Sequence, residues 1–245
     1  MIKLIRNEYI KNSRIKLFIG VIIIIFIVYF IIKFNSNRSA DYLISTIYKF
    51  IPFVSILLCI LFGGIVSNEF HNGTIRVYLA KPVKRWKILL SKIILLYLYV
   101  LIFMIVTILS YFIIIKIYKG VYIDTKIVKE IFLYFIPVFF TGSVIIFLSI
   151  LTNSTAASVG ISILICFTSN LIAQIFFGFG YTIFQYTFLP YIDFSIFKDL
   201  NYIRLISSEL NVTLTINNGI IILLTFSLLF IFLSFNIFNK KDIKN

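Results

Sequence analysis

Long apolar runs separated by short polar segments make up most of the chain. Six runs are long enough, or nearly so, for a helix to cross the roughly 30 Å hydrocarbon core of a bilayer, which takes about 20 residues. Their central portions carry no charged residue, and a charge at mid-bilayer costs about 2.5–3.5 kcal/mol. The pattern predicts an all-α integral membrane protein, a single domain over 1–245, with transmembrane helices at about 17–34, 50–67, 88–115, 131–151, 157–177 and 219–238.

Prolines and loop lengths add detail to this topology. Pro52 and Pro137 fall inside the second and fourth runs, where we expect kinks. Residues 152–156 are the whole connection between the fourth and fifth runs, so these two helices are expected to form an antiparallel hairpin. Before the first run, Ile2, Ile5, Tyr9 and Ile10 share one helical face opposite Lys3, Arg6, Asn7 and Lys11. This stripe predicts an amphipathic helix lying in the membrane interface.

The connection between the fifth and sixth runs is long and unusually aromatic. It covers residues 178–218 and includes the stretch GFGYTIFQYTFLPYIDFSIF. A solvated loop has no reason to be so apolar, and loops of this length are usually functional. We expect short re-entrant or interfacial helices here, broken at Gly178, Gly180 and Pro190; an ordinary interfacial belt of Tyr and Phe is the alternative. The central aromatic and proline residues of this segment are Phe184, Tyr186, Phe188, Pro190 and Tyr191.

Composition agrees with a membrane protein and narrows its partners. Of the 245 residues, 61% are hydrophobic and only 13% charged, against about 25% charged in an average soluble domain. The net charge of +14 lies in clusters that flank the apolar runs, where anionic lipid headgroups account for it. A nucleic-acid partner is therefore not expected, whereas membrane lipid is. Cys59 and Cys166 each lie inside an apolar run and are interpreted as small apolar fillers.

Lysine and arginine set the expected orientation. The face holding both termini and the loop 67–87 carries thirteen Lys and Arg against three acids, and the other face nine against six in longer loops. The positive-inside rule then places both termini in the cytoplasm. The loop 116–130, with four Lys, is the weakest part of this assignment. The predicted location is a bacterial plasma membrane, because the abundance of Ile, Asn and Lys suggests an AT-rich bacterial genome.

Several kinds of chemistry are missing. The only histidine is His71, in a loop, so a Ser–His or zinc site inside the membrane cannot be assembled. No pair of carboxylates lies in any run, and no P-loop motif is present. The chain is therefore expected to be non-catalytic and to hold no metal or cofactor of its own. Asn170 and Gln174, one turn apart in the fifth run, are the best intramembrane polar contacts, and interhelical hydrogen bonds are their simpler role.

The polar segment 67–92 interrupts the apolar pattern most strongly. It holds the only histidine, the only tryptophan and six of the 23 Lys and Arg residues. Asn72-Gly73 predicts a turn, followed by a short helix over about 74–80 that ends before Pro82.

One face of that short helix is apolar. Ile75, Tyr78 and Leu79 share this face, and Arg76 points away from it. A partly apolar helix held between two membrane helices is suited to fill a groove on a soluble partner. A plain basic loop is the alternative at this point.

The same segment resembles a known family. Its pattern E-x-x-x-G-T followed by P-x-x-R-x-x-x-x-x-x-K resembles the membrane permease subunits of ABC-2-type transporters. The matching positions are Glu69, Gly73, Thr74, Pro82, Arg85 and Lys92. The layout is similar as well: an N-terminal interfacial helix, six spans, a cytoplasmic helix between spans two and three, a long outer segment between spans five and six, and a basic C-terminal tail.

The resemblance implies partners and roles. In that family the loop between spans two and three is a coupling helix, seated in a groove of a separate ATPase subunit that binds ATP and Mg²⁺. A second permease copy, or a related permease, completes the assembly, and the outer segment forms re-entrant helices near an external gate. The residues implied at this gate are Phe184, Tyr186, Phe188, Pro190 and Tyr191. The residues implied in ATPase coupling are Glu69, Gly73, Thr74, Ile75, Tyr78, Leu79, Pro82 and Arg85.

The expected substrate is hydrophobic or amphipathic. Small permeases of this kind resemble exporters of peptide toxins, bacteriocins and peptide antibiotics, and walls of Phe, Ile and Tyr suit such cargo. Two alternatives remain open at this point. One is a membrane scaffold or sensor partner that transports nothing; the other is a self-powered secondary transporter that uses Asn170 and Gln174.

Overall fold

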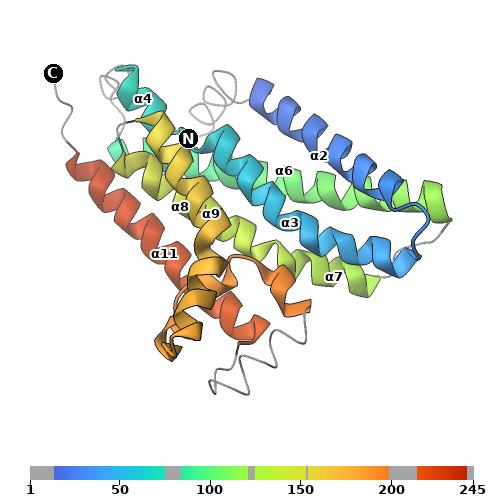
Figure 1. Cartoon of the computed structure of the whole chain (residues 1–245). Helices are drawn as coiled ribbons and strands as arrows, with labels where there is room; N and C mark the ends of the chain where they lie inside the picture. The colour runs from blue at the N-terminus through green and yellow to red at the C-terminus, as the bar shows by residue number, and fades with distance from the viewer. Residues whose placement is uncertain (1–13, 75–83, 121–124, 153, 199–213, 242–245) are drawn as a thin grey trace.

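The structure, a computed structural model, describes residues 14–74, 84–120, 125–152, 154–198 and 214–241. Within these ranges the chain is a bundle of α-helices with three short 3-10 helices (Figure 1). The helices are α2 (Arg14–Phe34), α3 (Ala40–Phe62), α4 (Ser67–His71), α6 (Arg85–Lys119), α7 (Thr125–Tyr134), α8 (Ile136–Leu151), α9 (Thr155–Gly178), η2 (Thr182–Tyr186), η3 (Leu189–Tyr191), η4 (Phe194–Lys198) and α11 (Ile216–Lys240).

The six predicted spans are confirmed as helices. Six helical stretches in the described part of the chain are long and apolar enough to cross a membrane. A helix suits this environment because all its backbone hydrogen bonds are made within the segment. The longest, α6, has 35 residues and is about 52 Å long at 1.5 Å per residue. It therefore extends well beyond a 30 Å hydrocarbon core or crosses it at a tilt.

The outer surface of the bundle is apolar, as its interior is. Helices α3, α6 and α8 form its centre, with α2 lying along α6, α9 against α3 and α8, and α11 along α8 (Figure 1). The peripheral helices expose large apolar side chains, such as Ile22 on α2, Phe167 on α9 and Phe232 on α11. Exposed apolar surface on this scale is rare on soluble monomers, and it suits contact with lipid.

Polar side chains inside the bundle mostly bond to their own helix. The hydroxyls of Thr107, Thr141 and Ser143 are buried and donate to carbonyls three or four residues earlier. Such bonding lets small polar residues sit in an apolar core without an unsatisfied donor. Where two helices meet, Cys59 Sγ on α3 and Cys166 Sγ on α9 lie 3.6 Å apart as free thiols.

The helix boundaries differ from the sequence expectation most clearly at the second and fourth spans. The helix of the second span, α3, begins at Ala40 rather than near 50, because Ser39 caps the helix by accepting a hydrogen bond from the Tyr42 backbone N–H. The expected kink at Pro137 is a break between α7 and α8, with Pro137 in the first turn of α8, where its missing N–H costs nothing. At Pro52, in contrast, α3 continues without a break.

The two ends of the bundle differ in character. One end, called here the termini end, carries the start of α2, the end of α11, α4 and the roots of the loop between α4 and α6 (Figure 1). The opposite end carries the link from α2 to α3, the start of α7 and the 3-10 helices. The predicted interfacial helix over the first residues lies outside the described residues.

Candidate functional site

A buried ion pair joins the two roots of the loop between α4 and α6. Glu69 lies on α4 and Lys92 on α6, with Lys92 Nζ 2.9 Å from Glu69 Oε1. The two side chains are 3% and 0% exposed. Lys92 Nζ also donates to the Ile65 carbonyl oxygen at 3.2 Å, where the chain turns between α3 and α4. Charges this deep require a partner, so the pair fixes α4 against α6.

Helix α4 is also fixed to α8. The backbone N–H groups of Val66 and Ser67 donate to Ser149 Oγ at 2.8 and 2.9 Å. These are free donors at the start of a helix, which otherwise need a capping side chain from their own chain segment. Here the hydroxyl comes from α8, some eighty residues later in the sequence. A single serine thus holds the first turn of α4 in place.

Close backbone packing brings the start of α9 against the end of α3, next to α4. The Ser158 hydroxyl on α9 donates to the Gly63 carbonyl oxygen, directly after α3 ends. A Cβ atom at Gly63 would lie 2.7 Å from the Val159 side chain and 3.0 Å from its Cα. Only glycine therefore allows the end of α3 and the start of α9 to approach this closely.

Two basic residues attach the end of α11 to the same end of the bundle. The Arg85 guanidinium, at the start of α6, donates to the carbonyl oxygens of Asn239 at 3.2 Å and Lys241 at 3.3 Å. Lys241 Nζ donates to the Ile150 carbonyl oxygen at the end of α8 and lies 4.3 Å from the centre of the Phe70 ring. Cations are favourable at helix carboxyl ends. The ends of α4, α6, α8 and α11 thus form one connected cluster, the termini-end cluster.

The predicted coupling residues fall into two groups. Of the described ones, Glu69 is buried, Arg85 and Gly73 are exposed, and Thr74 is half-buried. Gly73 has φ +65°, and the Asn72-Gly73 turn is confirmed; this backbone conformation suits glycine. Since its carboxylate faces Lys92 inside the bundle, Glu69 presents no surface for contact with a soluble partner in this structure. Ile75, Tyr78, Leu79 and Pro82 lie outside the described residues.

At the opposite end, the aromatic segment packs onto the bundle. Phe184 stacks on Phe176 of α9 with ring centres 4.0 Å apart. Phe188 lies 5.2 Å from the ring of Phe140 on α8 and 5.3 Å from that of Phe226 on α11. Pro190 and Tyr191 are buried, whereas Tyr186 is exposed. The chain turns at Gly180, with φ +80°, as expected; Pro190, expected as a break, lies within η3.

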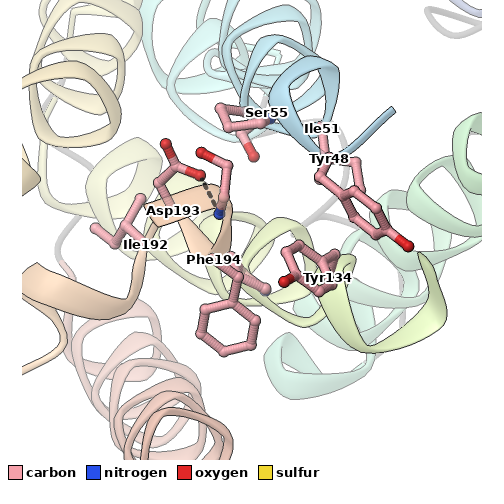
Figure 2. A pocket seen from close by; sticks show the side chains of 10 residues that line it. Tyr48, Ile51, Ser55, Tyr134, Ile192, Asp193 and Phe194 are labelled. Atoms are coloured by element: carbon pink, nitrogen blue, oxygen red, sulfur yellow. Dashed lines mark hydrogen bonds between the residues drawn. The ribbon is translucent and has the colours of Figure 1, made fainter. Parts of the chain in front are cut away.

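A cavity of about 230 Å³ lies between this segment and the bundle. Its wall is formed by α3, α9 and the stretch between η3 and η4, with residues Lys49, Pro52, Phe53, Ser55, Ile56, Cys166, Phe167, Asn170, Ile192 and Asp193. A narrow crevice adjoins it and shares Ser55 and Asp193 (Figure 2). In Figure 2, Ser55 points from its helix toward the segment between η3 and η4 that carries Asp193. Tyr48 and Tyr134 lie farther along the crevice.

Asp193 is a candidate residue that the sequence analysis missed. It is the only acid between residues 178 and 198, and its position inside an aromatic stretch was the available signal. Asp193 Oδ1 accepts the Ser195 backbone N–H at 2.8 Å, as a cap for η4. Burial raises the pKa of its carboxyl group, and the hydrogen bonds from Ser195 offset part of that rise.

The raised pKa predicts a pH-dependent stability. The folded state holds the Asp193 proton more tightly than the unfolded chain does. The stability that this proton contributes is therefore fully present below the ordinary aspartate pKa and is lost as the pH rises through the raised pKa. Asp193→Asn keeps the oxygen that caps η4 and removes the charge. We expect wild-type thermal stability in detergent to fall as the pH rises above the ordinary aspartate pKa, and the variant to lose part of that slope. Equal slopes in wild type and variant, with Glu130→Gln as a charge-matched control, would contradict the assignment.

The two predicted intramembrane polar residues have different surroundings. Asn170 lines the cavity, and its Oδ1 is buried with no hydrogen-bond partner in the described part of the chain. Gln174, one turn later, is exposed on α9. Among the residues that the structure covers, no group of three His, Cys, Asp or Glu side chains is placed to hold a metal ion.

Fold and composition together define a multi-pass α-helical membrane protein. A family model described as "Protein of unknown function (DUF2705)" matches residues 17–244. The chain belongs to this family, and the match covers every predicted span. No curated protein matches the chain.

Proposed function

We propose that this chain is the transmembrane permease subunit of an ATP-driven ABC exporter, and that the loop between α4 and α6 docks a separate ATPase. The permease pairs with a second copy or with a related permease. ATP and Mg²⁺ bind to the ATPase alone, so the chain itself is not an enzyme. Its place is a bacterial plasma membrane, with the termini end in the cytoplasm.

The termini-end cluster is the observation that carries this proposal. The loop has one root on α4 and the other on α6, and the Glu69–Lys92 ion pair joins them. Ser149 adds α8, and Arg85 adds α11. A displacement of the loop is therefore passed to four helices together rather than absorbed by one flexible turn. This is the mechanical property that a coupling loop requires.

The cluster also explains the motif that resembles the ABC-2 permeases. Glu69, Arg85 and Lys92 are three of its positions, and all three bond to neighbouring elements at this end of the bundle. In our proposal the Glu69–Lys92 ion pair holds the two roots of the loop together inside the bundle, and Ile75, Tyr78 and Leu79 make the contact with the ATPase. The resemblance assigned Glu69 to the contact surface; its burial favours the bracing role.

The opposite end is the proposed external gate. The segment from η2 to η4 packs against α8, α9 and α11 and lies beside Ser55, well inside α3. We infer that it enters the membrane as a re-entrant element, with Pro190 and Tyr191 as its buried part, Phe184 and Phe188 half-buried, and Tyr186 at the surface. A gate of aromatic rings suits a hydrophobic or amphipathic cargo, and a peptide toxin, bacteriocin or peptide antibiotic is the proposed substrate class.

Reconstitution tests the function directly. Vesicles containing the chain and its ATPase are expected to move a fluorescent amphipathic peptide in the presence of ATP and Mg²⁺, and the peptide is expected to stimulate ATP hydrolysis. A Walker-motif variant of the ATPase is the matched control. Stable complex formation without transport and without stimulation would instead favour the scaffold or sensor alternative.

A further inference from the structure

The cavity beside Asp193 has the features of a built binding site. Its volume of about 230 Å³ is below the range of about 300–1,000 Å³ for pockets that enclose a drug-sized ligand. It therefore fits a headgroup or a single side chain and leaves the rest of the ligand outside. Phe53 and Phe167 on its wall are 59% and 68% exposed, so an apolar remainder can lie along them in the membrane.

The polar wall of the cavity presents hydrogen-bond acceptors. Ser55 is 2% exposed, and its Oγ has no hydrogen-bond partner in the described ranges of the chain. Asn170 Oδ1 is also buried and has no hydrogen-bond partner among the described residues. Asp193 adds a carboxyl group, with one oxygen engaged by Ser195. Buried acceptors without partners are costly, and a ligand with several N–H donors would satisfy them together.

A primary ammonium group matches these acceptors. It brings three donors and a positive charge opposite the Asp193 carboxylate, and charge-assisted hydrogen bonds are stronger than neutral ones. A quaternary ammonium group has no N–H donor and would leave the acceptors unsatisfied. Water would also fill such a polar space, but water brings no positive charge, and a carboxyl group whose pKa is raised by burial ionises more readily beside a cation.

Lys49 gives the site a second, opposite charge. It is an exposed residue on α3 that lines the same cavity. Ser55 follows six residues later on the same helix, about 9 Å farther along the axis. The cavity thus offers a cation near its rim and a carboxyl group deeper inside. A lone amine would be repelled by Lys49, whereas a zwitterion would bind both ends.

We propose that this cavity binds the headgroup of a zwitterionic aminophospholipid, with the ammonium group at Asp193, Ser55 and Asn170, the phosphate at Lys49, and the acyl chains along Phe53 and Phe167. The site does not depend on the proposed transport function, because it is formed by a single chain without the ATPase. Its occupant would hold the aromatic segment against α3 and α9.

The test compares headgroups by thermal unfolding of the purified chain in detergent. Short-chain phosphatidylethanolamine is expected to raise the melting temperature and to bind at least about tenfold more tightly than phosphatidylcholine of the same chain length. Phosphatidylglycerol controls for the phosphate alone, and decylamine for the ammonium group alone. Equal protection by ethanolamine and choline lipids would overturn the proposal.

Variants separate the site from the surrounding surface. Asn170→Leu and Asp193→Asn are expected to abolish the preference for ethanolamine lipid, while Gln174→Leu, one turn along α9 and outside the cavity, keeps it. Lys49→Gln is expected to weaken the binding of phosphatidylethanolamine, which loses its phosphate contact, and to strengthen the binding of decylamine, which is no longer repelled. If a lysine-rich amphipathic peptide protects the protein through Asp193 and ethanolamine lipid does not, the cavity is a cargo site and the lipid assignment is wrong. Each variant's melting temperature without ligand reports its folding.

Discussion

Lys92→Met is expected to lower the free energy of unfolding by about 3–5 kcal/mol, because it leaves the Glu69 carboxylate buried without its cation. Both side chains are almost fully enclosed, so water cannot replace the lost partner. The measurement is unfolding in mixed detergent micelles, followed by circular dichroism. Lys84→Met is a matched control, since Lys84 is an exposed lysine just before α6.

The double variant Glu69→Leu with Lys92→Met separates charge from packing. Replacing both members of a buried ion pair by apolar side chains is often neutral or stabilising, so most of the lost stability is expected to return. A single variant with wild-type stability would mean that the pair does not hold α4 to α6. A double variant as unstable as the single one would show that packing, rather than an unpaired charge, causes the loss.

Replacing residues 74–80 by a Gly/Ser linker is expected to abolish ATP-driven transport while the chain stays folded. The linker removes the apolar face of Ile75, Tyr78 and Leu79, and with it the proposed contact with the ATPase. The termini-end cluster lies on either side of the replaced stretch and is left intact, so the melting temperature is expected to change little. The measurements are ATP-dependent peptide uptake and thermal unfolding on the same preparation.

A subtler variant checks that result. Tyr78→Asp with Leu79→Asp keeps the loop length and disrupts only the apolar face, and it is expected to lose transport as fully as the linker does. Arg76→Ala, on the other face of the predicted helix, is expected to retain most of it. Normal transport by the linker variant would contradict the coupling role of this loop.

The spans follow directly from the sequence because the membrane imposes length and composition on each helix separately. Their ends were less predictable. The first turns of α3 contain Tyr42, Ser45, Thr46 and Lys49, which lower the local hydropathy, so a pattern based on apolar runs starts the helix too late. Ser39 was the signal for the true start, as an N-cap residue.

The candidate sites could be recognised only from the three-dimensional structure. Glu69 and Lys92 were visible as motif positions, but their distance in sequence gave no reason to expect an ion pair, because no helical periodicity relates residues on different helices. Asp193, Ser55 and Asn170 come from three separate segments, and only packing brings them to one cavity. Periodicity could not show that Asn170 turns inward at this cavity while Gln174, on the same helix, stays exposed.

The central claim is that this chain works with a separate ATPase, and co-purification from membranes tests it most directly. The tagged chain would be extracted in a gentle detergent or in nanodiscs, and its partners identified and quantified by mass spectrometry. We predict a P-loop ATPase in roughly equal amount, absent when residues 74–80 are replaced by the linker. A folded chain that is recovered without any ATPase would contradict the claim.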